Sequence, residues 1–396
     1  MGPHGAVRIV YMLPLIAASM LLGCAGSPST TPTSKIPLAL PVAATSYQNE
    51  KGLNIGPQTL PYSQSTVTAR AFGDFVQRGS LDLFVATTTF DPSARPSQAA
   101  RGNFEFWRRQ PDNTFVRDTV LLANNAGCTF PTKAIVADLN QDGKPDVFVA
   151  CRGLGATAFV GEKSAVVLSQ PNGRYEITFL ATEGAFVSAA AADFTGSGHA
   201  DVIVIDANTT TRDTSGRFKD GFPIDSTTTA LILANDGHGS FTPKAALLGS
   251  FTTDFTVVEA LDLNNDSRPD IVLLGADGGY GQPSIVLLND GTGSFAQVHP
   301  IILPRSRLAN PAPQDVVFID NALFVSRTDG STPGKRTVQR IAWPSLASKV
   351  VYDGAADSSL FEAGWMIPAT RDGHTQLTSD SARKLAGLAV SPKKKE

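Results

Sequence analysis

One nine-residue pattern occurs three times in this chain, as Asp138-Leu-Asn-Gln-Asp-Gly-Lys-Pro-Asp146, Asp193-Phe-Thr-Gly-Ser-Gly-His-Ala-Asp201 and Asp262-Leu-Asn-Asn-Asp-Ser-Arg-Pro-Asp270. Each copy has oxygen-bearing side chains at positions 1, 3, 5 and 9, and a small residue at position 6. An apolar run follows position 9 in every copy, and such a run is typical of a buried β-strand. The pattern therefore predicts a polar loop that leads into a strand.

Calcium is the ligand that this spacing favours, because a hard cation takes about six to eight oxygen ligands and a tight loop can supply them. The small residue at position 6 suits a backbone with positive φ. Unlike an EF-hand, the pattern closes with Asp at position 9, and strands flank it instead of helices. The predicted ligands are the side chains of Asp138, Asn140, Asp142, Asp146, Asp193, Thr195, Ser197, Asp201, Asp262, Asn264, Asp266 and Asp270, with the backbone carbonyls of Lys144, His199 and Arg268.

The three loops are expected to bind calcium with different strengths, since affinity follows ligand charge and rigidity. The 138–146 loop has three carboxylates and a glycine at position 6, so it should bind most tightly. The 262–270 loop has the same charge, but Ser267 must adopt a conformation that glycine accepts more readily. The 193–201 loop has only two carboxylates and should bind most weakly. Polar turns without metal are the alternative for each loop.

The loops belong to a longer internal repeat. A degenerate copy runs from Asp74 to Asp82, and the copies start 64, 55 and 69 residues apart. Asn/Asp/Gly clusters follow the loops between apolar runs, most clearly in Leu233–Phe241 and Leu287–Phe295, and predict hairpin turns. One unit thus reads as strand, loop, strand, connection, strand, turn and strand.

Four strands in a unit of about 60 residues are typical of one blade of a β-propeller. We therefore expect an all-β propeller over residues 46–390 with about six blades, five and seven being the alternatives. A damaged fifth unit follows Val316, and residues 50–62 are expected to complete the last blade. The polar insertion 206–226 is a candidate recognition loop or an unconstrained surface loop.

These units resemble the FG-GAP/VCBS repeats of the integrin-α-like propeller family, whose hallmark is Asp-x-Asx-x-Asp-Gly-x-x-Asp between the first two strands of a blade. The resemblance covers residues from about 65 to 300 well and to about 355 weakly. Thr195, Ser197 and Ser267 depart from the hallmark. The resemblance implies calcium as a structural ion, and partners that bind on a blade-end face or in the central channel.

The N-terminus predicts export. Residues 1–23 have a basic residue and then an apolar stretch that is short for a membrane span, which is typical of a signal peptide. The stretch ends in Leu21-Leu22-Gly23-Cys24, which resembles a bacterial lipobox, with Cys24 as the lipidated residue. Residues 24–45 are rich in Pro, Ser and Thr and form the expected tether. This implies a protein held in the cell envelope, at the outer membrane, by its lipid. The alternative is an ordinary cleaved signal with an incidental cysteine.

Charge and cysteine content narrow the class of protein. The net charge is −3, and the one basic run lies in the 391–396 tail, so no nucleic-acid partner is expected. Cys128 and Cys151 bracket the first loop, and export makes a disulfide between them possible. Two buried free thiols are the alternative.

The sequence is compatible with three functions. The favoured one is a monomeric binding or scaffold module for an unknown protein or glycan. The alternative is a hydrolase or lyase acting on polysaccharide, although the chain has neither a His-Glu-x-x-His nor a Gly-x-Ser-x-Gly motif. Gly330–Arg336 is one residue short of a phosphate-binding loop and is expected to be a turn. An accessory lipoprotein without its own ligand is the third possibility.

The lipid anchor gives the first testable prediction. Cys24→Ala should abolish incorporation of a labelled fatty acid and release the protein from the membrane fraction, because the acylated thiol is lost. Metabolic labelling followed by fractionation measures both effects. An unlabelled wild type together with a membrane-bound variant would contradict the anchor.

Overall fold

The structure is a computed structural model, and every residue that it describes belongs to the compact unit Leu38–Glu396. The signal peptide, Cys24, the tether, the 50–62 segment, nearly all of the 206–226 insertion and the basic tail lie outside the described residues. Among the described residues, no helix is long and apolar enough to cross a membrane. The described ranges are 65–79, 82–89, 100–111, 115–153, 161–207, 229–248, 255–277, 282–332, 334–355, 368–371 and 374–377.

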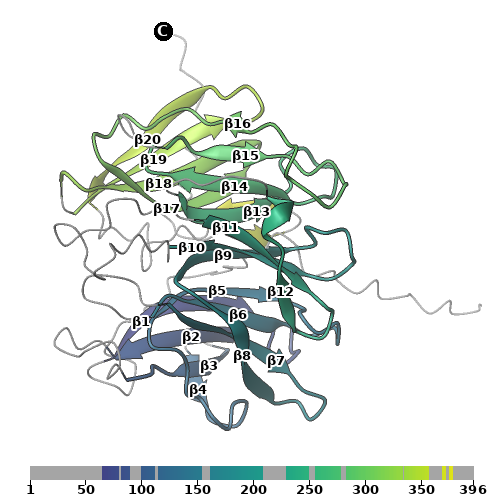
Figure 1. Cartoon of the computed structure of the whole chain (residues 1–396). Helices are drawn as coiled ribbons and strands as arrows, with labels where there is room; N and C mark the ends of the chain where they lie inside the picture. Colours follow the sequence, from purple (N-terminus) through teal and green to yellow (C-terminus); the bar gives the residue numbers. More distant parts are fainter. Residues whose placement is uncertain are drawn as a thin grey trace, which may run out of the picture. The chain divides into compact units, whose positions relative to one another are not determined.

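The described chain forms five four-stranded antiparallel sheets, which confirms the predicted all-β propeller fold and its four-stranded blades (Figure 1). The sequence favoured about six blades, and the five observed in the described chain match the lower of the two alternatives. Blade 1 contains β1 (Ser65–Gly73), β2 (Asp82–Thr89), β3 (Phe104–Arg109) and β4 (Phe115–Asp118). Blade 2 contains β5 (Pro131–Ala137), β6 (Asp146–Cys151), β7 (Glu162–Ser169) and β8 (Tyr175–Gly184). Blade 3 contains β9 (Phe186–Ala192), β10 (Asp201–Asp206), β11 (Thr229–Asn235) and β12 (Phe241–Pro243).

The last two blades and a short hairpin follow in the same order. Blade 4 contains β13 (Phe255–Leu261), β14 (Asp270–Gly275), β15 (Ile285–Leu287) and β16 (Ile301–Ile302). Blade 5 contains β17 (Pro311–Ile319), β18 (Ala322–Asp329), β19 (Lys335–Ala342) and β20 (Ser348–Ala355). A 3₁₀ turn, η4 (Ala245–Leu247), follows β12. Strands β21 (Pro368–Arg371) and β22 (His374–Leu377) pair only with each other in the described chain, so they add a hairpin and not a sixth four-stranded sheet.

Successive blades pack through their first strands. Contacts link β1 to β5, β5 to β9, β9 to β13 and β13 to β17. Four apolar clusters fill the spaces between neighbouring blades. In blades 2 to 4 the inner strands therefore have one apolar face toward the blade before them and another toward the blade after them. This explains why the runs after the ninth position, such as Val147–Ala150, are continuously apolar and fully buried.

The first strand of every blade carries a β-bulge or register shift near its start, for example between Pro131 and Lys133 in β5. The shift pairs Cys151 with Pro131, whereas counting symmetrically across the loop points to residue 133. A bulge also re-aims the side chains that follow it. In β5 the bulge precedes Lys133, a buried lysine.

An ion pair in the interior joins two blades that are not neighbours. The Lys133 ammonium of blade 2 contacts the Glu259 carboxylate of blade 4 and donates to the Val258 carbonyl at 3.2 Å. Between these blades lies β9, where the Ser188 hydroxyl oxygen accepts the Val258 N–H at 3.1 Å. Because the pair is almost fully buried, losing one partner would leave a charge in a poorly solvated place.

The interior ion pair gives the second prediction. Lys133→Ala should lower the free energy of unfolding by about 3–5 kcal/mol, because the Glu259 carboxylate loses its lysine. A Lys133→Met/Glu259→Leu double variant should recover most of that loss. Chemical denaturation measures both, with Lys163→Ala as the control for removal of an exposed lysine. Equal losses in Lys133→Ala and Lys163→Ala would contradict the assignment.

Candidate metal centre

The repeated loops lie at the same place in successive blades, between the first and second strands. The 138–146 loop joins β5 to β6, the 193–201 loop joins β9 to β10, and the 262–270 loop joins β13 to β14. In the first of these, Gln141 and Gly143 have φ of 60° and 79°. Ser267 has φ of 65° at the same position as Gly143, so a serine adopts here the left-handed conformation that glycine accepts more readily.

The aspartate at position 1 holds the loop by accepting two of its backbone N–H groups. Asp138 accepts the N–H of Asp142 at 3.1 Å and that of Gly143 at 2.9 Å. Asp193 and Asp262 make the same pair of bonds in their loops, and Asp74 makes it in the degenerate loop. Position 1 therefore shapes every copy of the loop.

Positions 3 and 5 of the 138–146 loop keep their oxygens near the surface. The Asn140 Oδ1 accepts the N–H of Asp142 at 3.1 Å, and the Asp142 Oδ1 accepts the N–H of Lys144 at 2.9 Å. The other Asp142 oxygen accepts the Ser169 hydroxyl at 2.7 Å. Oxygens that are oriented by backbone N–H groups and face outward are of the type that calcium uses.

The aspartate at position 9 is different, because it is completely buried beneath the loop. The Asp146 Oδ2 accepts the N–H of Leu139 at 2.8 Å and of Asn140 at 3.2 Å, and its Oδ1 accepts the N–H of Ser169 at 2.7 Å. One carboxylate thus connects the start of the loop to the last residue of β7. Asp201 and Asp270 form the equivalent connections to the N–H groups of Asn235 and Asn289.

Burial also sets the proton affinity of these carboxyl groups. It raises the pKa of Asp146 to about 7 and that of Asp270 to about 6, although their N–H partners act in the opposite direction. A raised folded-state pKa means that the folded chain holds the proton more tightly than the unfolded chain. Protonation of Asp146 therefore adds stability that is complete below about pH 4 and is lost as the pH rises through about 7.

The degenerate loop of blade 1 separates the structural positions from the candidate ligand positions. It has lost the oxygens at positions 3 and 5, yet Asp74 and Asp82 remain hydrogen-bonded to backbone N–H groups. At its position 5, Arg78 places a guanidinium 2.7 Å from the Asp82 carboxylate. The first position therefore organises a loop that has no metal-type ligands at positions 3 and 5, while the ninth position links the loop to the end of β3.

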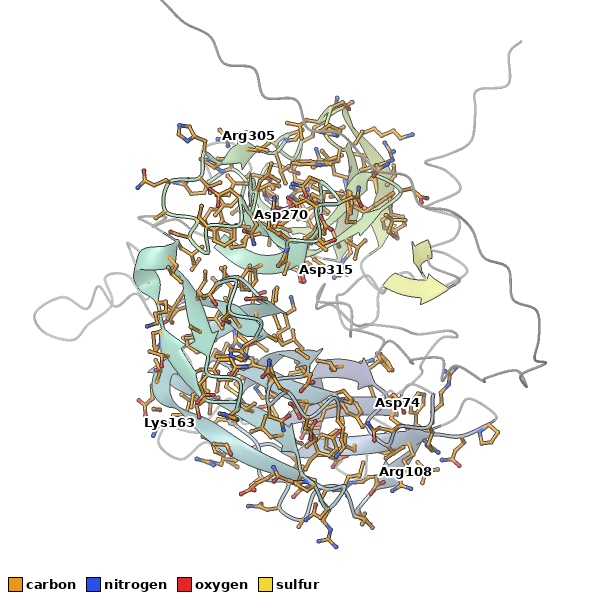
Figure 2. The ribbon with its side chains drawn as sticks, turned by 90° about the vertical axis from the view of Figure 1, so that its right-hand side faces the viewer. Asp74, Arg108, Lys163, Asp270, Arg305 and Asp315 are labelled. Atoms are coloured by element: carbon orange, nitrogen blue, oxygen red, sulfur yellow. A yellow bond between two sulfur atoms is a disulfide. The ribbon has the colours of Figure 1, made fainter. Side chains whose placement is uncertain are left out.

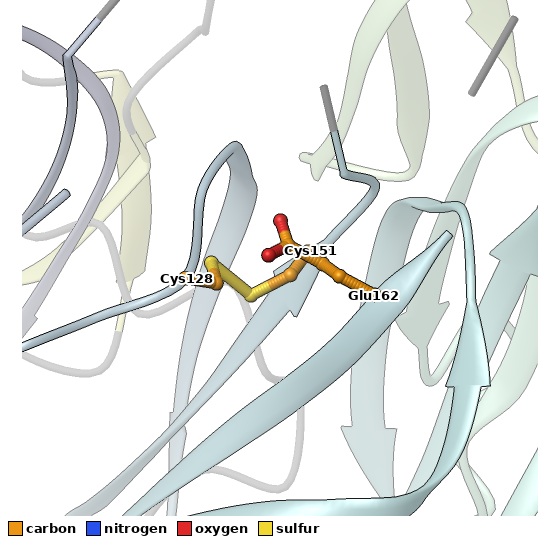
Figure 3. A group of neighbouring side chains, drawn as sticks. All are labelled: Cys128, Cys151 and Glu162. Atoms are coloured by element: carbon orange, nitrogen blue, oxygen red, sulfur yellow. A yellow bond between two sulfur atoms is a disulfide. The ribbon is translucent and has the colours of Figure 1, made fainter. Parts of the chain in front are cut away.

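The donor types fit calcium at positions 1, 3 and 5 of the 138–146 and 262–270 loops, while the ninth carboxylate is engaged with backbone N–H groups. Within the described ranges, no three carboxylates of these loops bring one oxygen each within 4.8 Å of one another. In the part of the chain that the structure describes, the potential ligand atoms that lie this close together belong to Cys128, Cys151 and Glu162 (Figure 3).

The loops also differ in what already contacts position 5. The Lys144 ammonium lies 3.7 Å from Asp142, whereas the Arg268 guanidinium lies 2.5 Å from Asp266. A cation binding to the third loop would have to displace that guanidinium. In the second loop the Thr195 hydroxyl donates to Asp201 at 2.8 Å, and this bond orients the hydroxyl within the loop. The order of calcium affinity among the three loops stays a prediction.

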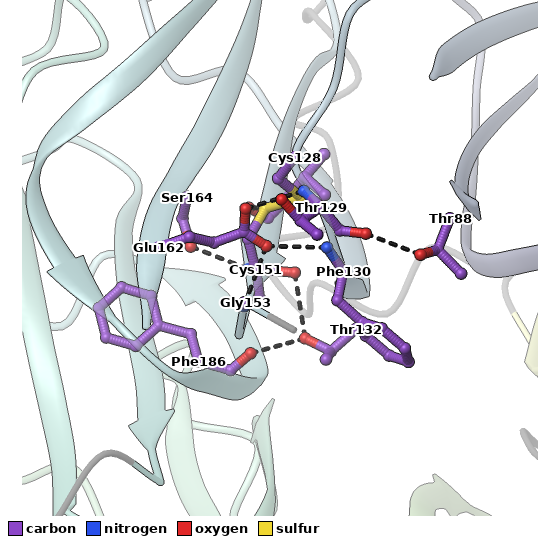
Figure 4. The surroundings of a disulfide bond; sticks show 12 residues. Thr88, Cys128, Thr129, Phe130, Thr132, Cys151, Gly153, Glu162, Ser164 and Phe186 are labelled. Atoms are coloured by element: carbon purple, nitrogen blue, oxygen red, sulfur yellow. Dashed lines mark hydrogen bonds between the residues drawn. A yellow bond between two sulfur atoms is a disulfide. The ribbon is translucent and has the colours of Figure 1, made fainter. Parts of the chain in front are cut away.

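The Cys128–Glu162 group is a structural crosslink and offers no thiolate, because Cys128 and Cys151 form a disulfide with a Cα–Cα distance of 6.3 Å. Glu162 accepts the N–H groups of Thr129, Phe130 and Gly153 at 2.8, 2.8 and 2.9 Å (Figure 4). The carboxylate and the disulfide together fix the segment that leads into β5. The positions of the two cysteines in the sequence suggested a disulfide, but no sequence pattern indicated that Glu162 would lie beside it.

Comparisons with known proteins add no family. No protein-family model and no curated protein matches the chain. Among solved structures, the Dos1 propeller is 10% identical with a TM-score of 0.37, over 74% of this chain and 71% of that one. The periplasmic gluconolactonase PpgL of Pseudomonas aeruginosa is 12% identical with a TM-score of 0.38, over 70% of each chain. A GH43_1 enzyme from Xanthomonas citri is 10% identical with a TM-score of 0.34, over 70% of this chain and 86% of that one.

The ninth position gives the third prediction. Asp146→Asn should lower the free energy of unfolding in calcium-free buffer by about 1–3 kcal/mol, because an amide nitrogen would face backbone N–H donors. Asp142→Asn, at an exposed position of the same loop, should cost less than about 1 kcal/mol without calcium. Urea denaturation in chelator compares the two. A larger loss from Asp142→Asn would show that the ninth position does not hold the loop.

Proposed function

We propose that this protein is a lipid-anchored propeller of the cell envelope that acts as a binding or scaffold module and is stabilised by calcium, as its resemblance to FG-GAP/VCBS repeats implies. Its partner would be a protein or a glycan. The observation that carries the proposal is that each buried carboxylate in the described chain contacts a backbone N–H group or a basic side chain of the fold.

Nine aspartate and glutamate side chains are buried in the described chain. Asp146, Asp201 and Asp270 accept backbone N–H groups both of their loops and near the end of the third strand, and Asp82 accepts the N–H of Arg109 at the end of β3. Four other buried carboxylates form ion pairs with basic side chains: Glu105–Arg117, Asp118–Arg108, Glu259–Lys133 and Asp277–Arg327. Asp315 accepts the N–H of Val316 and lies in the field of Arg336.

This arrangement supports binding over catalysis. A general acid or base must exchange a proton with a substrate group within hydrogen-bond reach. Carboxylates that are buried and paired with arginines, a lysine or backbone amides support the fold instead. The polysaccharide-active alternative would need a pair of carboxylates about 5–10 Å apart facing a cleft.

Calcium would act as a structural ion at the loops, where its role would be to stiffen the turn between the first two strands of a blade. The Asp142 and Asp266 carboxylates with their neighbouring oxygens would hold it most strongly, and the 193–201 loop least. At a dissociation constant of about 10⁻⁴–10⁻³ M, calcium at about 1 mM would stabilise the fold by roughly 0.4–1.4 kcal/mol per site.

The fourth prediction concerns calcium. Adding about 1 mM calcium after chelation should raise the melting temperature, and Asp142→Asn should remove the largest part of that rise, because it takes a charged ligand from the tightest loop. Asp266→Asn should remove less. Differential scanning fluorimetry and titration calorimetry measure the rise and the stoichiometry. Asp236→Asn is the matched control, since Asp236 is an exposed turn aspartate outside the loops. No calcium-dependent shift in the wild type would remove the calcium proposal.

Binding is tested separately from calcium. A glycan array and crosslinking on intact cells should identify a partner that is retained by the purified propeller. The partner should then be recovered with unchanged mass after prolonged incubation. Shortened or eliminated products would contradict a binding role and favour the polysaccharide-active alternative.

A further inference from the structure

A cavity lies beside the outer strands of blade 5, and it is separate from the aspartate loops. Its volume is about 550 Å³, which is within the range of about 300–1,000 Å³ of small-molecule sites. The connection between β16 and β17 forms one wall through residues 305–308. Strands β19 and β20 form the rest, with Thr337 and Gln339 as buried residues and Ser348–Val350 as exposed ones.

Buried polar contacts hold the wall in place. Gln339 is 93% buried, and its amide nitrogen donates to the carbonyls of Pro304 and Arg305, each at 3.3 Å. Its amide oxygen accepts a bond from Arg327 at 2.9 Å, and Arg327 pairs with the Asp277 carboxylate at 2.6 Å. The connection is thus tied to β19 and to the loop after β14 through one chain of hydrogen bonds. The cavity is a built feature of the fold.

The charge of the lining contrasts with that of the whole chain. Four side chains are cationic, Arg305, Arg307, Lys335 and Lys349, and one is acidic, Asp353. The chain as a whole has a net charge of −3. The Lys335 ammonium pairs with Asp353 at 3.0 Å, so the single acid neutralises one cation at most. The described residues give neither Arg307 nor Lys349 an acidic partner.

We infer that this cavity binds a small anionic ligand, namely a sugar of up to about disaccharide size whose charge comes from carboxylate or phosphate groups. Arg307 and Lys349 would meet the anionic oxygens, because guanidinium and ammonium groups form charge-assisted hydrogen bonds with them. The hydroxyls of Ser306, Thr337 and Ser348 offer partners for sugar hydroxyls. The inference rests on the proposed binding role and adds to it a place and a ligand class. Arg305 marks the wall after β16 in Figure 2.

The experiment uses the exported chain with three probes: digalacturonate, inorganic phosphate and neutral cellobiose. Titration calorimetry at low salt should detect digalacturonate, phosphate or both, and cellobiose should bind at least about tenfold more weakly. Arg307→Ala/Lys349→Ala should weaken the anionic probe by about tenfold or more. If only digalacturonate binds, the anionic groups of the ligand are carboxylates. If phosphate binds as tightly as digalacturonate, they are phosphates.

The matched control is Lys163→Ala/Lys244→Ala, which removes two exposed cations from blades 2 and 3 and should leave the affinity unchanged. Equal affinity for cellobiose, an unaffected Arg307→Ala/Lys349→Ala variant, or no binding of either anion would overturn the inference. Partner crosslinking on the same double variant separates the two proposals. A retained cellular partner with no anion binding would leave the binding role intact and remove this cavity as its site.

Discussion

Four of the five blades depend on one recurring contact, made by the buried aspartate at the end of the loop between the first two strands. Asp146 accepts N–H groups from the beginning of its loop on one oxygen and the N–H of Ser169 on the other. The same side chain therefore orients the turn between strands 1 and 2 and fixes the turn after strand 3. Blades 1 to 4 all contain a buried aspartate at this position that accepts a backbone N–H at or just after the end of the third strand.

Blade 5 shows what replaces this contact when the loop is lost. Strands β17 and β18 are joined by Asp320 and Asn321, which have φ of 48° and 53°, a two-residue turn that matches the twist of a hairpin. The Asn321 carbonyl accepts the N–H of Trp343 at 2.8 Å, so a backbone bond connects the first turn to the end of β19. A blade can therefore be closed without a carboxylate. On this account the proposed calcium would be an addition to a loop that the ninth aspartate already holds.

The sequence was sufficient to predict the repeated blades. The spacing from Asp138 to Asp146 and the apolar run after it reflect requirements of the local backbone, namely a tight loop followed by a buried strand. It could not distinguish a ninth aspartate that binds a cation from one that binds amides, because both roles need an acceptor at that spacing. The Lys133–Glu259 pair joins residues 126 positions apart, so no local sequence pattern could predict it. The cationic cavity likewise gathers residues 305–308 with residues 335–353, and only the folded blades bring them together.

The most direct test of the central claim is hydrogen exchange at the amides that the ninth aspartates accept. Mass spectrometry or NMR would follow Leu139, Ser169, Asn235 and Asn289 in calcium-free protein containing chelator. The account predicts slow exchange at all four sites, at rates close to those of the adjoining strands, because buried carboxylates hold these amides without metal. Rapid exchange in chelator that becomes slow only when calcium is added would contradict it, since the metal would then hold the loops.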